Sequence, residues 1–373
     1  MKSRRILITG GAGFIGSHLA DELLAQGHQV RVIDSLETQV HGESAEIPAY
    51  LNPEVEFFRG DLRKIEDIRH ALEGIDTVYH FAAAVGVGQS MYEIARYTAI
   101  NNQGTANLLQ CLIERPVQRL MVASSMSIYG EGIYQDPEGR SCNVCERSFE
   151  QLKNGQWELR SDHDAPLAPL PTPESKEPEP SSIYALGKLD QERMCLITGK
   201  AYNIPTTAFR FFNVYGPRQA LSNPYTGVIA IFASRFLNGK QPQIFEDGQQ
   251  QRDFVHVRDV ARCCRLPLDN EEASGEVFNV GSGQPITIER LTQRLAEAMD
   301  RSYLGYEITG KYRVGDIRHC FADISKARRI LGYAPEVPLE EGMRELTGWL
   351  EGEIATDHTE AARSELSQRG LTL

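Results

Sequence analysis

The sequence feature that most constrains the fold is a glycine-rich turn near the N-terminus. The apolar run Ile6-Leu7-Ile8 leads into glycines at positions 10, 13 and 16, and leucines then recur with helical spacing. This pattern predicts a buried strand, a tight turn and a helix. Gly10 permits the sharp turn, Gly13 lets backbone N–H groups approach a pyrophosphate, and Gly16 lets the helix pack closely on the strand. The turn is a candidate dinucleotide cradle, although an ordinary glycine turn can have the same residues.

An acidic residue at the end of the next predicted strand favours the dinucleotide interpretation. The apolar run at 29–33 ends in Asp34, which lies at about the distance, roughly 20 residues on, where such sites place a ribose-binding acid. A carboxylate there accepts hydrogen bonds from a ribose 2′-hydroxyl and repels a 2′-phosphate. We therefore expect NAD rather than NADP as the cofactor. A surface acid at a strand end is the alternative for Asp34 taken alone.

Composition argues against several classes of partner. The 373 residues carry a net charge of −12 and no block of Lys or Arg, which argues against nucleic acid or an anionic membrane as the main partner. No stretch approaches the ~18 apolar residues of a membrane span, and the first predicted strand leaves no space for a signal peptide. We therefore expect a cytoplasmic enzyme with no nucleic-acid or membrane partner. The seven cysteines are expected to be free thiols.

Further strands alternate with helices and predict an α/β fold with a doubly wound parallel sheet. Apolar runs predict strands at 55–62, 77–81, 119–123 and 206–212, with helices at about 98–114 and from 181 to about 199. Ligands of such a sheet bind at the carboxyl ends of its strands. Asp61 lies at one of these ends, where it can face the adenine of the cofactor or cap the next helix. The small residues at 82–88 allow backbone to lie close to a flat group such as nicotinamide.

A catalytic set follows from a serine at a strand end and a Tyr-x-x-x-Lys spacing. Ser125 ends the predicted strand at 119–123, and Tyr184 and Lys188 share one face of a predicted helix. The tyrosine–lysine spacing is common by chance, but it here follows a dinucleotide cradle. A tyrosine base working near pH 7 needs its pKa lowered by roughly three units, or about 4 kcal/mol. An adjacent ammonium and an oxidised nicotinamide can supply that shift.

Residues 131–180 break the alternation. They are rich in proline and lack core periodicity, which predicts an insertion. Cys142 and Cys145 have the spacing of half a zinc site, so the insertion is a candidate partial zinc-ribbon-like loop. The further candidate ligands are only Asp162, His163 and Asp164. Two free loop thiols are therefore the favoured interpretation, and no metal site is expected.

Two arginines beyond residue 213 are candidates to bind a second diphosphate. Arg252 and Arg313 stand in polar–aromatic clusters, and a guanidinium fork matches phosphate oxygens. A surface salt bridge is the commoner role for either arginine alone.

With these motifs in place, the chain resembles the extended short-chain dehydrogenase/reductase family, specifically its NAD-dependent nucleotide-sugar epimerase/dehydratase group. The resemblance runs from Ile6 to about Trp349 and rests on Thr9 to Gly16, the Ser125, Tyr184 and Lys188 set, Asn213, Arg252-Asp253 and Arg313 to Asp316. It implies a Rossmann domain at 1–212 that contains the insertion, a smaller C-terminal α/β substrate-binding lobe at 213–350, and a solvated, partly helical tail at 351–373. The chain is expected to cross back to the Rossmann domain near 253–283. A homodimer through a four-helix bundle of the helices near 98–114 and 184–199 is also implied.

The resemblance further implies the roles of site residues. Tyr184 as phenolate removes a sugar hydroxyl proton while hydride passes from the same carbon to NAD, Ser125 hydrogen-bonds the reacting oxygen, and Lys188 binds the nicotinamide ribose. The predicted cofactor contacts are Gly10, Gly13, Phe14, Ile15, Gly16, Asp34, Asp61, Leu62, Ala82, Ala83, Ala84, Asn101, Tyr184 and Lys188. The predicted substrate contacts are Gly86, Val87, Ser127, Asn213, Val228, Arg252, Arg313 and Asp316.

Neighbours of the catalytic set narrow the reaction. The 4,6-dehydratases that resemble this chain have Asp-Glu after the triad hydroxyl, where Met126 and Ser127 stand here, so elimination of water is not expected. Glucuronate 4-epimerases tend to carry an arginine near the small-residue loop, where this chain has Gln89, which favours a neutral or 6-deoxy sugar. The cysteine-containing insertion with Trp157-Glu158 resembles a bacterial subgroup that includes dTDP-L-rhamnose 4-epimerases, although that subgroup typically has two CxxC pairs and this chain has one.

The expected activity is NAD-dependent epimerisation of a dTDP- or UDP-linked hexose at C4 through a transient 4-keto intermediate. A 4-ketoreductase or 4-dehydrogenase, which would release cofactor in each turnover, is the alternative enzyme. A Rossmann-type dinucleotide-sensing regulatory protein is the alternative of another class, against which the complete Ser125, Tyr184 and Lys188 set argues.

Overall fold

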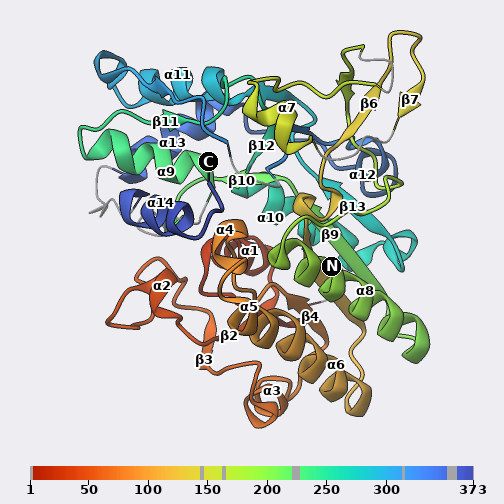
Figure 1. The fold of residues 1–373 in the computed structure, drawn as a ribbon. Coiled ribbons are helices and arrows are strands. Elements are labelled where there is room, and N and C mark those ends of the chain that lie inside the picture. Colours follow the sequence, from red (N-terminus) through yellow and green to blue (C-terminus); the bar gives the residue numbers. More distant parts are fainter. Residues whose placement is uncertain are drawn as a thin grey trace.

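A parallel sheet of seven strands forms the centre of the first domain (Figure 1). The computed structural model describes residues 3–142, 147–161, 165–220, 227–312, 316–350 and 359–372. The strands follow the order β13-β9-β5-β4-β1-β2-β3, and every neighbouring pair is parallel. Their bounds are β1 Arg5–Thr9, β2 Gln29–Asp34, β3 Glu56–Arg59, β4 Thr77–His80, β5 Arg119–Ser125, β9 Thr206–Phe211 and β13 Val277–Val280. The predicted doubly wound α/β fold is confirmed.

Helices cover both faces of this sheet because its strands are apolar on both sides. In β1, Ile6 and Ile8 belong to the core on one face and Leu7 to the core on the other. The first core includes side chains of α1, α10 and α12, and the second includes side chains of α3, α6 and α8. The helix bounds are α1 Phe14–Ala25, α2 Thr38–His41, α3 Ile65–Ala71, α4 Val87–Ser90, α5 Ile94–Tyr97, α6 Gly104–Glu114, α8 Ile183–Tyr202, α10 Val257–Arg265 and α12 Ser325–Leu331.

Two helix boundaries position parts of the site. The predicted helix at 98–114 consists of a π-helical turn, Thr98–Gln103, that continues directly into α6. Such turns are rare and often mark functional sites. Helix α8 begins after Ser182, whose Oγ accepts a hydrogen bond from the Ala185 N–H at 3.1 Å. This cap places Tyr184 in the first turn of α8, directly over the carboxyl edge of the sheet.

A smaller lobe lies above the sheet in the view of Figure 1. Its strands and helices are β10 Asn213–Tyr215, α9 Val228–Leu237, β11 Gln243–Ile244, β12 Gln251–His256, β14 Pro285–Thr287, α11 Ile288–Ala298, β15 Glu307–Ile308, β16 His319–Cys320 and α13 Leu339–Leu350. Short 3₁₀ turns span Met126–Tyr129, Leu266–Asp269, Glu271–Ala273 and Ser302–Leu304. The lobe has a core of its own around Phe236, Leu291 and Leu346. Between the two halves of the lobe, α10 and β13 return the chain to the main sheet.

The insertion at 131–180 contains more regular structure than its sequence suggests. Strands β7 Ser141–Cys142, β6 Ile133–Gln135 and β8 Ala168–Leu170 form an antiparallel sheet in that order, and α7 Phe149–Lys153 follows β7. Its buried core consists of Tyr134, Leu159 and Leu167, with Cys142 packed against it. The insertion leans on the lobe, because the Gly132 N–H donates to the His319 carbonyl at 2.8 Å.

The C-terminal tail is less solvated than the sequence predicts. Helix α14, Thr359–Gln368, lies close to α4 (Figure 1). Leu366 is buried at 5% exposure, and its side chain packs against Gly88. The Tyr92 hydroxyl donates to Glu365 at 3.3 Å, and Arg369 lies over the Tyr92 ring. Among the described residues, no helix combines the length and the apolarity needed to cross a membrane.

Candidate active site

One large cleft runs between the carboxyl edge of the sheet and the lobe. Its volume of about 840 Å³ lies within the range of ligand-binding pockets, ~300–1,000 Å³. Among the predicted site residues, Asn101 does not line the cleft and Arg313 lies outside the described residues. The others all line it: Gly10, Gly13, Phe14, Ile15, Gly16, Asp34, Asp61, Leu62, Ala82, Ala83, Ala84, Gly86, Val87, Ser125, Ser127, Tyr184, Lys188, Asn213, Val228, Arg252 and Asp316. The individual role of each residue stays a prediction.

The glycine turn has the shape of a phosphate cradle. Gly10 has a φ of 69°, and a Cβ on it would lie 2.8 Å from backbone atoms of Ala82. A Cβ on Gly16 would lie 2.5 Å from the carbonyl oxygen of Gly10. Since neither position accepts a side chain, the N-terminus of α1 can approach a ligand closely and offer its free N–H groups to a pyrophosphate. The cradle therefore fits NAD.

Asp34 stands at the end of β2 in the wall of the same cleft. Its Oδ2 accepts a hydrogen bond from the Ala12 N–H at 3.1 Å, and its Oδ1 accepts one from the Leu36 N–H at 2.9 Å. These bonds fix the carboxylate and leave lone pairs for a ribose hydroxyl. A fixed negative charge at this position also disfavours the 2′-phosphate of NADP, as the sequence predicts.

Asp61 pairs with a neighbouring side chain. Arg63 donates from Nε and Nη2 to its Oδ2 at 2.9 and 2.6 Å, and this pairing lowers the pKa of Asp61. Helix α3 begins at Ile65 with Lys64 as its N-cap residue. The capping alternative for Asp61 is therefore wrong, while its carboxylate remains in the cleft wall beside Leu62.

Asn101 acts through Ala84 and not by lining the cleft. Its Oδ1 accepts a hydrogen bond from the Ala84 N–H at 2.7 Å, and its Nδ2 donates to the Ala84 carbonyl at 3.1 Å. Asn101 is fully buried. Asn101 therefore fixes the small-residue segment that forms the wall, and its predicted direct contact with the cofactor stays a prediction.

Ser125, Tyr184 and Lys188 come together at the floor of the cleft. Ser125 ends β5, and the other two lie on one face of the first turns of α8. A hydrogen bond joins the side chains of Tyr184 and Ser125. Ser125 Oγ also accepts hydrogen bonds from the N–H and the hydroxyl of Ser127 at 3.2 and 2.9 Å. The Ser125 hydroxyl hydrogen is thus left to donate to the phenol oxygen.

The pKa values of the tyrosine and the lysine follow from their shielded positions. Removal from water raises the pKa of Tyr184 above its usual value of 10.0, and the hydrogen bond to Ser125 opposes that rise. Burial lowers the pKa of Lys188 to about 8. The polypeptide alone therefore does not lower the tyrosine pKa as the sequence analysis expects. The positive charge of an oxidised nicotinamide is the remaining contribution that favours the phenolate.

A buried glutamine that the sequence analysis missed holds Lys188. Gln191 Oε1 accepts a hydrogen bond from Lys188 Nζ at 2.7 Å, while its Nε2 donates to Thr105 Oγ1 at 2.9 Å. His80 Nε2 lies 2.8 Å from the same threonine oxygen, and burial lowers the pKa of His80 to about 3. The imidazole is therefore neutral. The only sequence signal for Gln191 is its position three residues after Lys188.

The lobe contributes the opposite wall, in which Arg252 is partly buried. Its Nη1 donates to the Arg318 carbonyl at 2.9 Å, and its Nη2 donates to the Ile317 carbonyl. Asp316 Oδ1 lies 3.8 Å from Nη2. The guanidinium is therefore fixed against one short segment of backbone in the cleft wall.

Two amide oxygens in this wall have no partner within the described chain. Asn213 Oδ1 and Gln250 Oε1 are buried and accept no hydrogen bond. A buried polar atom without a partner costs about 1–3 kcal/mol. Lining residues that the sequence analysis did not identify include Phe245, Gln250, Leu366 and Leu371.

The cysteine pair of the insertion is only half described. Cys142 Sγ lies 3.7 Å from the Tyr134 carbonyl oxygen. Cys145 and the residues at 162–164 lie outside the described residues. Within the described ranges, no three His, Cys, Asp or Glu side chains are placed to share a metal ion.

Comparison with known proteins agrees with the arrangement of the cleft. The profile of the NAD dependent epimerase/dehydratase family matches residues 6–149 and 162–281. A dTDP-L-rhamnose 4-epimerase from Burkholderia thailandensis is 32% identical over 359 residues, which are 94% of this chain and 96% of that protein. The structure of a UDP-N-acetylglucosamine 4-epimerase from Methanobrevibacter ruminantium, in complex with UDP-N-acetylmuramic acid, matches with a TM-score of 0.76 and 29% identity over 95% of this chain and 100% of that one. A UDP-glucose 4-epimerase from Thermus thermophilus, in complex with NAD, matches with a TM-score of 0.73 and 30% identity over 94% and 100% of the two chains. These matches confirm the predicted family resemblance and the predicted NAD cofactor.

Proposed function

Because the chain belongs to the NAD dependent epimerase/dehydratase family, we propose that it interconverts two nucleotide-diphosphate hexoses that differ in configuration at C4. The observation that carries this proposal is the meeting of Ser125, Tyr184 and Lys188 in one cleft, with a dinucleotide cradle in one wall and Arg252 in another. The cleft lining extends from the glycine turn at Gly10 to Arg252 in the lobe, which gives a cofactor and a second diphosphate separate walls. The substrate we propose is a dTDP- or UDP-linked neutral or 6-deoxy sugar.

The side chains at the cleft floor match the proton transfers of this reaction. The Tyr184 phenolate accepts the proton of the sugar C4 hydroxyl and later returns a proton to the 4-keto oxygen. When the sugar is bound, the Ser125 hydroxyl hydrogen turns from the phenol oxygen to that oxygen and stabilises the charge that develops on it. The Lys188 ammonium favours the phenolate and binds the cofactor ribose. When bound, NAD supplies a reversible hydride acceptor next to C4. Because the hydride that NAD would accept is also the one that it would give back, the reaction would consume no cofactor.

The residues after Ser125 favour epimerisation over elimination. Met126 has no ionisable group, and the Ser127 hydroxyl is already used as a donor to Ser125. Neither side chain can act as the acid or the base that removes water. This chain therefore lacks, at these two positions, the acid–base pair that a dehydratase needs.

The charges near the small-residue segment favour a sugar without a carboxylate. Gln89 follows this segment, and the nearest arginine on that wall, Arg96, is already paired with Glu93 at 2.7 Å and Glu37 at 3.0 Å. A carboxylated sugar would bring a further negative charge to an arginine that two carboxylates already neutralise. A neutral or 6-deoxy hexose meets no such repulsion.

Proton NMR in D₂O tests the proposal directly. The purified protein is mixed with dTDP-L-rhamnose and a panel of UDP- and dTDP-hexoses, with and without added NAD. We expect inversion at C4 without deuterium in the sugar, and no inversion with Tyr184→Phe. Deuterium at C3 or C5 would contradict internal hydride return, and turnover only of a 4-keto sugar with NADH or NADPH would favour the alternative ketoreductase. NAD binding without turnover of any sugar would favour the regulatory protein.

We further propose a homodimer that forms through α6 and α8. These adjacent helices expose Ile113, Leu186 and Ile197, the last at 66%. Large apolar side chains on two neighbouring helices suit a four-helix contact with a second copy. Light scattering should give twice the chain mass of 41.7 kDa, and Ile197→Asp should give the monomer. A cytoplasmic location also belongs to this proposal, because both NAD and nucleotide sugars are charged and do not cross membranes freely.

A further inference from the structure

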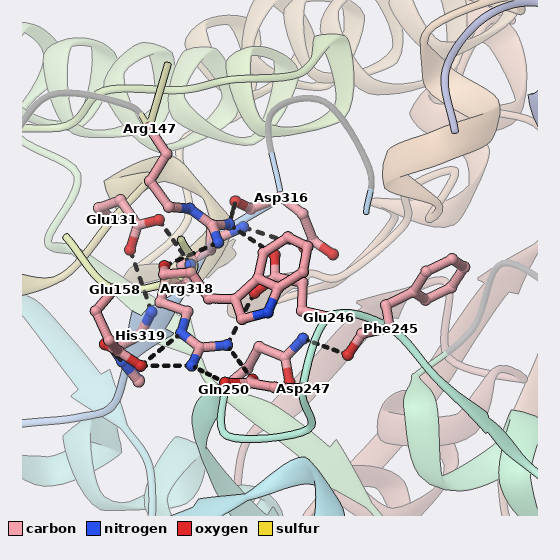
Figure 2. Close-up of polar contacts among 12 residues, drawn as sticks. Glu131, Arg147, Glu158, Phe245, Glu246, Asp247, Gln250, Asp316, Arg318 and His319 are labelled. Atoms are coloured by element: carbon pink, nitrogen blue, oxygen red, sulfur yellow. Dashed lines mark hydrogen bonds and ion pairs between the residues drawn. The ribbon is translucent and has the colours of Figure 1, made fainter. Parts of the chain in front are cut away.

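The insertion reaches the lobe wall of the cleft through a buried network of charges (Figure 2). Glu246, from the loop after β11, lies between two guanidinium groups. Its Oε1 is 2.8 Å from Nη2 of Arg147, which belongs to the insertion, and its Oε2 is 2.8 Å from Nη1 of Arg318. The three side chains are 1%, 2% and 0% exposed in that order. Water therefore cannot replace these pairings. A movement of either segment would leave a buried charge without its partner, so the ion pairs hold the segments in place.

The backbone of Glu246 supports a special role for its side chain. Its φ is 53°, in the left-handed region that favours glycine. A non-glycine residue stays in this region only when the surrounding contacts hold it there. Two kinds of contact hold Glu246: its carboxylate pairs with both arginines, and its backbone N–H and carbonyl bond to the Lys311 carbonyl and the Gly310 N–H at 2.8 and 3.2 Å.

The insertion also fixes the segment at 316–319. Arg147 Nη2 donates to the Asp316 carbonyl at 3.0 Å. Glu131 accepts hydrogen bonds from the backbone N–H groups of Arg318 and His319 at 2.6 and 3.1 Å. Glu158 contacts both side chains of that pair (Figure 2). Burial opposes the charge of Glu158, but the hydrogen bonds from His319 and Arg318 hold its pKa at about 2.

The two segments that the insertion holds adjoin or contact three residues that line the lobe wall of the cleft, Phe245, Gln250 and Arg252. Phe245 precedes Glu246 and lines the cleft, and the Phe245 carbonyl accepts a hydrogen bond from Gln250 Nε2 at 2.9 Å. Gln250 lines the same wall, and its Oε1 is buried there without a hydrogen-bond partner among the described residues. Arg252 donates to the carbonyls at 317 and 318. Each of these three cleft residues is therefore one contact away from the network.

We propose that Arg147 is a positioning residue for the nucleotide diphosphate of the substrate. It acts through Glu246 and the Asp316 carbonyl, and it thereby sets the places of Phe245, Gln250 and Arg252. The insertion is thus a part of the substrate site and not only an addition to the surface of the fold. This inference rests on the proposed function for the identity of the ligand, a dTDP- or UDP-linked sugar.

The test compares Arg147→Met with Arg140→Met. Arg140 lies in the same insertion, but it is 74% exposed, and its ion pairs within the described part of the chain are with Asp136 and Glu138. Both variants remove one guanidinium, and only the first one touches the network. Calorimetry measures the affinity for dTDP and UDP, absorbance measures the NAD that stays bound, and steady-state kinetics gives KM and kcat separately.

We expect Arg147→Met to weaken nucleotide binding by about tenfold or more, the effect of losing one charged hydrogen bond. KM should rise by a similar factor, while kcat and bound NAD stay within about twofold of the parent values, because the lost interaction concerns substrate binding. Arg140→Met should match the parent protein in every measurement. Equal nucleotide affinity in the two variants would overturn the inference.

Further variants keep the test decisive if Arg147→Met does not fold. Arg147→Lys keeps the charge but cannot reproduce the planar fork, so it should lose nucleotide affinity to a smaller degree and still more than Arg140→Met. Glu246→Gly relaxes the backbone but removes the shared carboxylate, and it should also lose affinity. Parent-like affinity in both variants would contradict the inference. A parent protein that binds neither dTDP nor UDP would overturn the proposed function as well, whereas parent binding with unchanged variants overturns the inference alone.

Discussion

Replacing Gln191 by methionine tests whether one amide keeps the catalytic lysine charged. Gln191 Oε1 is the acceptor for Lys188 Nζ at 2.7 Å, and burial already lowers the pKa of Lys188 to about 8. A hydrogen bond to a charged group contributes about 1.5–3 kcal/mol, and one pKa unit corresponds to about 1.4 kcal/mol. Methionine nearly keeps the volume and removes the acceptor. The pKa of Lys188 should therefore fall by about one to two further units.

The pH profile of kcat/KM for C4 epimerisation is the measurement. A lysine is charged below its pKa, so the activity that depends on the ammonium is present below that pKa and is lost as the pH rises through it. The alkaline limb should lie near pH 8 in the parent protein, where the Lys188 pKa lies. In Gln191→Met it should move to lower pH by about one to two units.

A matched control separates this effect from general damage to the helix. Arg193→Met lies on the exposed side of α8, away from the lysine, and should keep the parent pH profile. A reduced rate in Gln191→Met with an unmoved alkaline limb would refute the reasoning, because a purely structural loss changes the height of the profile and not its position.

Four further predictions concern the cofactor, the base, the core and the tail. Asp34→Ala should shift the ratio of NADP to NAD affinity upward by about tenfold or more, since the repelling carboxylate is gone; an unchanged ratio in a binding titration would count against the role of Asp34. Tyr184→Phe should lower kcat by about 10²- to 10⁴-fold at unchanged NAD content, and a loss of less than tenfold would contradict its assignment as the base. Glu192→Gln should reduce the free energy of unfolding in urea by about 3–5 kcal/mol, because the buried Arg210 guanidinium loses its two-oxygen partner; a change within error would be the opposing result. Deletion of 359–373 removes Leu366 from its contact with Gly88 in the cleft wall, so KM for the sugar should rise while bound NAD stays constant, and an unchanged KM would show that the tail does not contribute.

The sequence predicts those parts of the site whose functional residues lie close together in one short segment with a recognisable local structure. The turn from Gly10 to Gly16 must be glycine for steric reasons that act within a few residues and against one adjacent strand end. Tyr184 and Lys188 belong to a single helix whose period fixes their common face. Such patterns survive without any knowledge of the tertiary fold.

The residues that the sequence analysis missed are joined by contacts between distant segments. Gln191 meets His80 and Thr105, which are 111 and 86 residues away in the chain. No local pattern indicates such a meeting. The insertion was predicted without regular elements because its core has only three members, among them Tyr134 and Leu159, which is too few to produce a hydrophobic period.

The contact between the tail and the cleft was not predicted for a related reason, although the predicted helix is present as α14. Leu366 is an apolar residue in a polar helix. It is buried against Gly88 in the first domain, where the absence of a side chain leaves space for it. A single buried residue gives no periodic signal. Most residues of the helix are polar, so its sequence does not indicate that Leu366 contacts the cleft.

Buried polar groups hold both walls of the reaction site, and stability alone does not account for them. A buried ion pair is on average no more stabilising than apolar side chains of the same volume. The lobe wall nevertheless buries Arg147, Arg318 and Glu246, and Glu246 adopts a backbone conformation in which glycine would be unstrained. At the floor of the cleft, Lys188 is likewise buried and donates to Gln191. Such pairs fix the orientation of the side chains, because a hydrogen bond restricts both the distance and the angle between its two groups. We therefore expect conservative replacements in the lobe network to change nucleotide affinity, and those beside Lys188 to change its pKa. Replacements of equally buried apolar residues that cost the same free energy of unfolding should change both quantities less.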